Sequence, residues 1–198
     1  MKVLVTGAFG MVGRKLVDEL ETHGHELVLL DRVPPEQATM FVAGSEKRQP
    51  APFRTKWPCR QDDVTDPDAM VRAVEGMDAV IHLAAAVTGL PEHGCETFRV
   101  NCTSGWATLD ACRKGGVTRY LCASSINAFG TIYWRLSGKP SPYTSMPLNE
   151  DFEPVPEDAY SLSKHVNELT CAAFPRAFGV TAAAFRFAGV WSRKASTW

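Results

Sequence analysis

The chain has 198 residues, of which 45% are hydrophobic and 22% are charged, and its formal net charge is −1. This length is enough for one domain with a hydrophobic core, and the charge gives no indication of a nucleic-acid or anionic-membrane partner. No apolar run approaches the ~20 residues of a membrane span, and the six scattered cysteines favour reduced core thiols in a cytoplasmic protein over disulfides or a metal site.

The N-terminal residues carry a dinucleotide-binding pattern. Lys2–Thr6 predicts a short buried strand, the glycine-rich turn Gly7–Gly13 follows, and a helix then runs to about Gly24. The residues 27–30 predict a second strand, with Asp31 at its carboxyl end. Strand, glycine turn, helix, strand and acid in this order are typical of a βαβ unit that binds a dinucleotide.

Each residue type in this unit has a physical role. Gly7 permits the tight turn, Gly10 lets the backbone approach a pyrophosphate, and Gly13 allows close packing of helix on strand. The free N–H groups at the start of the helix favour the negative charge of the phosphates. Asp31 can accept hydrogen bonds from both ribose hydroxyls, which favours NAD. Arg32 keeps NADP open as the alternative, because an arginine there can hold the extra phosphate.

The next stretch, residues 33–58, is rich in proline and charge and predicts a long surface connection. We expect one short helix within it, near Glu36–Val42. A third strand should end at Gln61, and Asp66 or Thr65 should cap the helix that begins at Pro67.

Strands and helices continue to alternate through the rest of the chain. The expected elements are strands at 78–83, 119–123 and 180–187 and helices at 92–114 and from about Tyr160. The expected core stripes of the two helices are Phe98, Cys102, Gly105, Leu109 and Cys112 on the first, and Leu162, Val166, Leu169 and Ala173 on the second. We expect His82 to be a packed strand residue. The long loop 126–156 is of a length that is usually functional.

This alternation predicts an α/β fold, a Rossmann-type doubly wound parallel sheet in three layers. In such sheets the ligand lies beyond the carboxyl ends of the strands. Six candidate residues fall at predicted strand ends: Gly7, Gly10, Asp31, Asp63, Ala84 and Ser125.

Tyr160 and Lys164 stand four residues apart, on one face of a helix. Free tyrosine is mostly protonated at neutral pH, and a lysine cation beside it favours the phenolate. Such a pair can exchange a proton with an alcohol or a carbonyl. The spacing is weak evidence by itself, because it occurs by chance in many chains.

Taken together, these motifs resemble those of the extended short-chain dehydrogenase/reductases, and most closely the NAD-dependent epimerase/dehydratase family. The matching residues are Thr6–Gly13, Asp31, Asp63–Val64, His82–Ala85, Asn101, Ser124–Ser125, Pro147–Asp151 and Tyr160–Lys164. The match covers nearly the whole chain, in the order of the family.

The resemblance implies an enzyme that transfers hydride at a hydroxyl-bearing carbon of a small molecule related to a sugar or nucleotide sugar. Tyr160 would be the general acid/base, Lys164 would bind the nicotinamide ribose and lower the pKa of Tyr160, and Ser125 would bond the substrate oxygen. The implied cofactor residues are Gly7, Phe9, Gly10, Met11, Asp31, Asp63, Val64, Leu83, Ala84, Ala85, Asn101, Tyr160 and Lys164. It also implies a homodimer formed by the helices bearing Asn101 and Tyr160. It implies no metal.

The chain departs from the family pattern at three points. Phe129 stands where the family usually has tyrosine, and Gly189 stands where nucleotide-sugar enzymes tend to have asparagine. Extended members run to roughly 300 residues or more, beyond one typical domain. We therefore expect residues 1–198 to form an NAD(P)-binding domain whose C-terminal substrate lobe is missing or vestigial. A catalytically silent dinucleotide-binding sensor or scaffold, or a truncated fragment, are the alternatives.

Overall fold

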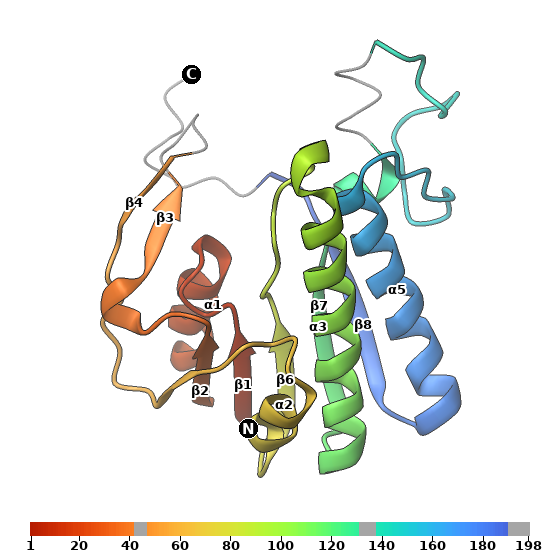
Figure 1. Cartoon of the computed structure of the whole chain (residues 1–198). Helices are drawn as coiled ribbons and strands as arrows, with labels where there is room; N and C mark the ends of the chain where they lie inside the picture. Colours follow the sequence, from red (N-terminus) through yellow and green to blue (C-terminus); the bar gives the residue numbers. More distant parts are fainter. Residues whose placement is uncertain (42–46, 131–137, 190–198) are drawn as a thin grey trace.

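The structure is a computed structural model that describes residues 1–41, 47–130 and 138–189. Its centre is a parallel sheet of six strands in the order β5-β2-β1-β6-β7-β8 (Figure 1). The strands are β1 Lys2–Thr6, β2 Glu26–Asp31, β5 Cys59–Gln61, β6 Ala79–His82, β7 Arg119–Ser125 and β8 Thr181–Phe187. All six predicted strands are present, and the predicted Rossmann-type fold is confirmed.

Helices lie on both faces of this sheet (Figure 1). They are α1 Met11–Thr22, α2 Pro67–Val74, α3 Gly94–Gly115 and α5 Ala159–Phe178. Alternate strand residues face opposite sides. Leu4 and Tyr120 belong to the core beneath α2, α3 and α5, whereas Val3 and Val5 pack in a second core with Val17 of α1.

The predicted start of α2 is confirmed. The carboxylate of Asp66 accepts hydrogen bonds from the amides of Asp68 and Ala69, at 2.9 Å and 3.2 Å. Pro67 follows as the first helical residue, where its missing N–H costs nothing.

The predicted core stripe of α5 was wrong. Leu162 and Leu169 are 41% and 56% exposed. The buried side chains are instead Ser161, Ser163, Lys164, Asn167, Cys171 and Phe174. The stripe with the more hydrophobic residues therefore faces outward, and the more polar one packs against the protein.

The predicted stripe of α3 was wrong at its N-terminal end, where Phe98 is exposed and Cys102 is only partly buried. Gly105, Leu109 and Cys112 are buried as predicted. The reason is the close packing of α3 on α5: a Cβ on Gly105 would lie 2.2 Å from the Oδ1 atom of Asn167. Small and polar residues fill this contact and leave the large side chains outside.

The connection between β2 and β5 contains a hairpin that the sequence did not reveal. A 3₁₀ turn at Pro35–Gln37 is followed by β3 Thr39–Phe41 and β4 Arg48–Pro50, which pair antiparallel. Of the short helix expected near Glu36–Val42, only Glu36 and Gln37 are helical, as part of this 3₁₀ turn. The prediction was wrong at Thr39–Phe41, which form a strand, and Val42 lies outside the described residues. Pairing between strands that are this short leaves no apolar periodicity to detect.

One face of the sheet lacks a cover over β7 and β8 in the described part of the chain. Phe185 is 51% exposed, and Leu121 and Phe187 on the same face are also exposed. Parallel sheets normally have helices on both faces.

Two further sequence expectations concern thiols and membranes. Cys112, Cys122 and Cys171 are buried, as predicted for core thiols, but Cys59 and Cys95 are exposed. Over residues 1–41, 47–130 and 138–189, no helix has both the length and the apolar character that crossing a membrane requires.

Candidate active site

The glycine turn between β1 and α1 leaves no room for a side chain at Gly7 or Gly13. Gly7 has a φ of +67°, and a Cβ there would lie 2.6 Å from the amide nitrogen of Ala84. A Cβ on Gly13 would lie 2.5 Å from the carbonyl oxygen of Gly7. Gly10 precedes α1, and no described side chain caps the free N–H groups at the start of this helix. The turn therefore fits a pyrophosphate, whose oxygens would accept bonds from these groups.

Asp31 is fixed next to this turn. Its carboxylate accepts hydrogen bonds from the amides of Phe9 at 3.1 Å and Arg32 at 2.8 Å. The side chain of Phe9 is buried against Phe53, so Phe9 enters the site through its backbone. Met11 is exposed at the start of α1. Asp31 is thus oriented by the loop that would hold the pyrophosphate, as a ribose-binding acid requires.

Asp63 and Val64 follow β5. The Oδ1 atom of Asp63 accepts bonds from the amide and the hydroxyl of Thr65, both at 2.8 Å. These bonds, the backbone one first, hold the pKa of Asp63 below its usual value. Val64 packs partly on the core. The acid is therefore a fixed, charged acceptor at the edge of the sheet.

Leu83, Ala84 and Ala85 leave β6 beside Gly7, all three half-buried. Asn101 on α3 holds the end of this segment. Its Oδ1 atom accepts from the amide of Ala86 at 2.8 Å, and its Nδ2 atom donates to the carbonyl of Ala86 at 3.0 Å and to the hydroxyl of Ser163 at 2.9 Å. Asn101 is therefore engaged with protein groups, and its cofactor-binding role stays a prediction.

His82 lies beneath the same segment. Its ring nitrogens lie 2.8 Å from Thr6 Oγ1 and 3.3 Å from Ser104 Oγ. Burial, with the positive charge of Lys164 adding to it, lowers the pKa of His82 to about 3. The imidazole is neutral at physiological pH and joins β1, β6 and α3, which confirms it as a packed strand residue.

Ser125, Tyr160 and Lys164 meet at the carboxyl end of β7. The side chain of Ser125 lies near the phenol of Tyr160 and acts to lower its pKa. The Nζ atom of Lys164 lies 5.5 Å from the centre of the Tyr160 ring and donates to the carbonyl of Ala123 at 2.8 Å. Asp158 caps α5 by accepting from the amide of Ser161 at 2.9 Å, which fixes where the helix begins.

Burial governs the ionisation of this group. It raises the pKa of Tyr160, against a smaller lowering by Ser125, and it lowers the pKa of Lys164. The pKa of Tyr160 was expected to be lowered by Lys164. It is raised here, and the ammonium lies over the ring and bonds the Ala123 carbonyl.

With this geometry in place, comparison with known proteins identifies the family. A profile described as "NAD dependent epimerase/dehydratase family" matches residues 3–196. The chain belongs to this family. The resemblance seen in the sequence is therefore confirmed, and NAD is the cofactor of the family.

Related proteins of this family differ in their printed activities. A UDP-glucose 4-epimerase of Corynebacterium glutamicum is 28% identical over 192 residues, which are 96% of this chain and 51% of that protein. A 3β-hydroxysteroid dehydrogenase/Δ5→4-isomerase of Mycobacterium tuberculosis is 28% identical over 196 residues, 96% of this chain and 47% of that protein. The chain spans about half the length of these curated relatives.

Solved structures have the same fold. A Thermotoga maritima UDP-glucose 4-epimerase crystallised with UDP-glucose superposes with a TM-score of 0.78 at 21% identity, covering 96% of this chain and 56% of that one. A short-chain dehydrogenase/reductase of Agrobacterium tumefaciens with bound NAD gives 0.74 at 26% identity, covering 94% and 49%.

Sequence reasoning missed three side chains that build this edge of the epimerase/dehydratase-family fold. Arg14 donates to the carbonyls of Phe9 and Ala51 and so ties the glycine turn to the loop after β4. Ser163 bonds Asn101, and Glu168 bonds Ser124. Glu168 had a readable signal, since it lies four residues after Lys164 on the same helix.

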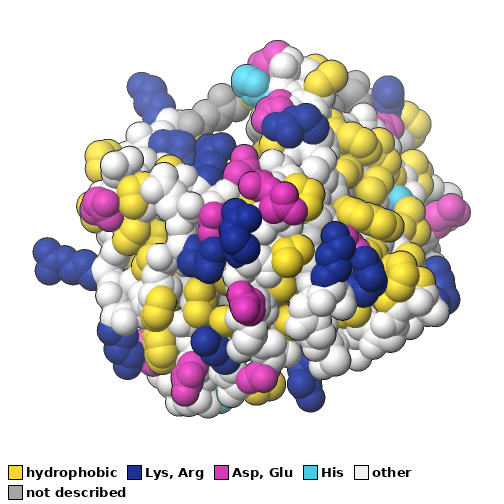
Figure 2. All heavy atoms as spheres, turned by 60° about the horizontal axis from the view of Figure 1, so that its bottom comes forward, with side chains coloured by type: hydrophobic (Ala, Val, Ile, Leu, Met, Phe, Trp, Pro, Cys, Tyr) yellow, Lys and Arg dark blue, Asp and Glu magenta, His cyan; other side chains and the backbone are white. Residues whose placement is uncertain are grey.

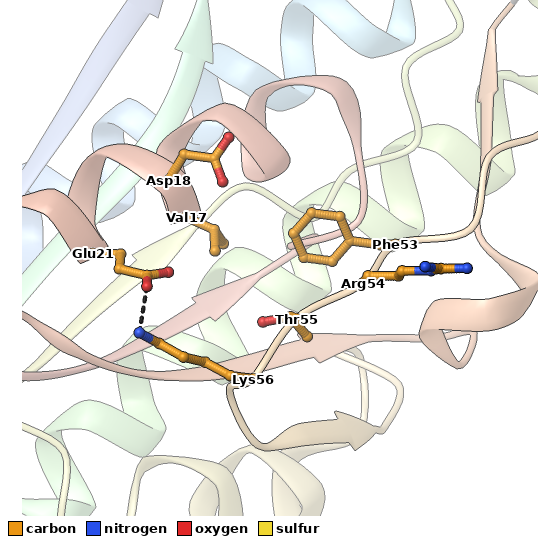
Figure 3. A pocket seen from close by; sticks show the side chains of 7 residues that line it. All are labelled: Val17, Asp18, Glu21, Phe53, Arg54, Thr55 and Lys56. Carbon is orange, nitrogen blue, oxygen red and sulfur yellow. Dashed lines mark ion pairs between the residues drawn. The ribbon is translucent and has the colours of Figure 1, made fainter.

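Two hollows of the surface lie away from these residues. One, of 370 Å³, lies between α1 and the loop before β5, where Glu21 and Lys56 form an ion pair across its rim (Figure 3). The other, of 580 Å³, is lined by residues near the amino ends of strands, including Lys2 and Glu26. Neither is lined by the glycine turn or by Tyr160, so neither is the candidate active site.

Proposed function

We propose that this chain binds NAD along the carboxyl edge of its sheet and takes part in hydride transfer at a hydroxyl-bearing carbon of a sugar or nucleotide sugar. The observation that carries this proposal is the meeting of Ser125, Tyr160 and Lys164 at the carboxyl edge of the sheet, the same edge at which the glycine turn leaves β1. The names of the relatives support the substrate class, because UDP-glucose 4-epimerases are among them.

In this proposal Tyr160 moves the proton. Its hydroxyl takes the proton of the substrate alcohol when the alcohol is oxidised, and returns it when the carbonyl is reduced. Ser125 bonds the same substrate oxygen and stabilises the charge that develops on it. Lys164 binds the nicotinamide ribose. Bound NAD supplies the carbon that accepts and returns the hydride.

The proposed binding of NAD is tested by calorimetric titration of the protein with NAD and with NADP. We expect NAD to bind in the micromolar range and Asp31→Ala to weaken NAD more than NADP, because only NAD would use both ribose hydroxyls on this carboxylate. Asp18→Ala, which removes an acid from the body of α1, is the matched control. Equal losses for both cofactors in Asp31→Ala would remove Asp31 from ribose binding.

The proposed hydride transfer is tested by mixing the NAD-loaded protein with UDP-glucose. Reduction of the cofactor is followed by the absorbance of the reduced nicotinamide. Tyr160→Phe should abolish the signal and retain NAD affinity. Unchanged turnover in this variant would exclude Tyr160 as the acid/base.

A second candidate function is a dinucleotide-binding sensor or scaffold without turnover. The relatives with printed enzyme names are about twice the length that this chain spans, so NAD binding by this half does not by itself establish turnover. NAD binding without reduction by any hydroxylated substrate would support this alternative.

We also propose a cytoplasmic homodimer formed through α3 and α5. Both helices present large hydrophobic side chains to the surface: Phe98 and Trp106 on α3 and Leu162 and Leu169 on α5. Figure 2 shows hydrophobic side chains gathered over these helices on one side of the molecule. Exposed apolar patches of this kind often mark protein–protein contacts.

A further inference from the structure

A buried ion pair joins α5 to the last strand, directly behind the candidate active site. The guanidinium of Arg186 donates two hydrogen bonds to the carboxylate of Glu168, from Nε at 2.8 Å and from Nη2 at 2.9 Å. Their side chains are only 20% and 13% exposed. The bonds to Arg186 and Ser124 outweigh burial and hold the pKa of Glu168 below its usual value, so the pair is charged. A buried pair with two parallel bonds fixes geometry more firmly than a surface pair.

This ion pair contacts the segment 124–129 at both of its ends. Ser124, the residue before Ser125, donates its hydroxyl to Glu168 Oε1 at 2.5 Å. Phe129, which ends the 3₁₀ turn after Ser125, lies with its ring 4.3 Å from the guanidinium carbon of Arg186. The Nη1 atom of Arg186 is buried without a hydrogen-bond partner among the described residues.

The same pair is anchored to the helix that carries the other two candidate catalytic residues. Glu168 lies one turn after Lys164 on α5, and two turns after Tyr160. The backbone of β8 pairs with that of β7, with Arg186 opposite Ser124. Glu168 and Arg186 therefore link the strand end that carries Ser125 to the helix that carries Tyr160.

We propose that Glu168 and Arg186 are positioning residues that hold the segment 124–129 so that the hydroxyl of Ser125 meets Tyr160. The catalytic meaning of this arrangement rests on the proposed function, whereas the arrangement itself can be tested without cofactor or substrate. Sequence alone gave Glu168 and Arg186 no role.

The experiment measures the ionisation of Tyr160 directly. Protein labelled with ¹³C at the tyrosine ζ carbons is titrated by NMR, and Tyr160→Phe assigns the resonance. The variants are Ser124→Ala, which removes one hydrogen bond and no charge, and Glu168→Gln. The control is Asp110→Asn, which breaks the pairs with Arg113 and Lys114 near the far end of α3. Near-ultraviolet circular dichroism verifies that each variant is folded.

If the pair positions Ser125, its loss moves Ser125 away from Tyr160 and removes the influence of Ser125 that lowers the pKa of Tyr160. The pKa should rise by about 0.5 unit or more in Ser124→Ala, the equivalent of one ordinary hydrogen bond, and stay unchanged in Asp110→Asn. In Glu168→Gln the direction of the change in the Tyr160 pKa is decisive. Loss of a nearby negative charge by itself would lower the pKa of a tyrosine, whereas loss of the positioning role would raise it. Asp158 and Lys164, the charged groups beside Tyr160, are intact in every variant.

A rise in either variant, with none in the control, supports the positioning role. A pKa that stays constant or falls in both variants overturns it. Titration of the same proteins with NAD separates this result from the proposed function. If the unaltered protein binds no NAD, the proposed function fails, and the tyrosine titration still decides the role of the pair.

Discussion

Asn101 on α3 and the backbone of Ala86 exchange two hydrogen bonds, of 2.8 Å and 3.0 Å. Ala86 ends the segment whose Ala84 lies against Gly7, so the amide of Asn101 holds the segment that packs on the glycine turn. The same side chain reaches Ser163 on α5, which places α3, α5 and the segment after β6 in one network.

Asn101→Ala should destabilise the protein by about 2 kcal/mol, because the polar backbone of Ala86 loses both of its partners. It should also weaken NAD binding, if NAD binds as proposed, since the segment that packs on the glycine turn is less firmly held. Urea unfolding and calorimetry measure the two effects. Asn149→Ala is the control, because Asn149 bonds Asp151 at the surface. An unfolding midpoint equal to that of the unaltered protein would show that the network contributes no stability.

His82 makes the stability of the protein depend on pH in a defined window. Its pKa is lowered from an ordinary 6.5 to about 3, so the unfolded chain binds more protons than the folded one between these values. Stability therefore falls as the pH drops through this window. A single group with this shift contributes about 2 kcal/mol between roughly pH 6 and pH 4.5.

His82→Gln should flatten the stability curve over this range relative to the unaltered protein, even if its stability at neutral pH is lower. His23→Gln, at an exposed position, is the control. Urea midpoints at a series of pH values give the curves. Parallel curves for His82→Gln and the unaltered protein would contradict the assignment.

Most of the fold was predictable, because the six strands of the parallel sheet are short apolar runs that alternate with helices. The two errors have local causes. The β3–β4 hairpin is built from strands too short to show a period of two. The stripes of α3 and α5 were read from hydrophobicity, whereas the Gly105–Asn167 contact demands small and polar residues between the helices.

The candidate site was predictable to a similar extent. The strand ends placed Gly7, Asp31 and Ser125 on one edge of the sheet, because parallel strands share that edge. The residues that orient them were not predictable. Glu168 and Arg186 lie on different elements, and their pairing depends on the register of β8 on β7.

Lys164→Met tests the burial of the lysine as well as its role. Burial lowers the pKa of Lys164, which means that the charged form costs stability at neutral pH. Methionine has a similar length without the charge, so we expect a variant at least as stable as the original. The same change should weaken NAD binding. It should also move the activity optimum to higher pH, because removing a positive charge 5.5 Å from the centre of the Tyr160 ring raises the pKa of the phenol further.

Thermal unfolding, calorimetry and a pH–activity profile measure these three effects. Lys15→Met, on the exposed side of α1, is the matched control for loss of a lysine. A cofactor affinity and a pH profile equal to those of the unaltered protein would count against the role of Lys164.

Leu169→Glu tests the proposed dimer through α3 and α5. Leu169 is 56% exposed on α5, and a carboxylate there would be buried without a partner if this surface meets a second copy. Loss of one buried leucine contributes roughly 1.5–3 kcal/mol, and so the dimer should dissociate at least tenfold more readily. Trp106→Glu on α3 should act in the same direction.

Phe185→Glu provides the comparison, because Phe185 is exposed to a similar degree on the bare face of β8. Sedimentation equilibrium of the three variants distinguishes the two hydrophobic surfaces. A dimer that persists in Phe185→Glu and dissociates in Leu169→Glu places the contact on the helices. Dissociation only in Phe185→Glu would move the contact to the open sheet face, and a monomer in the unaltered protein would refute the dimer altogether.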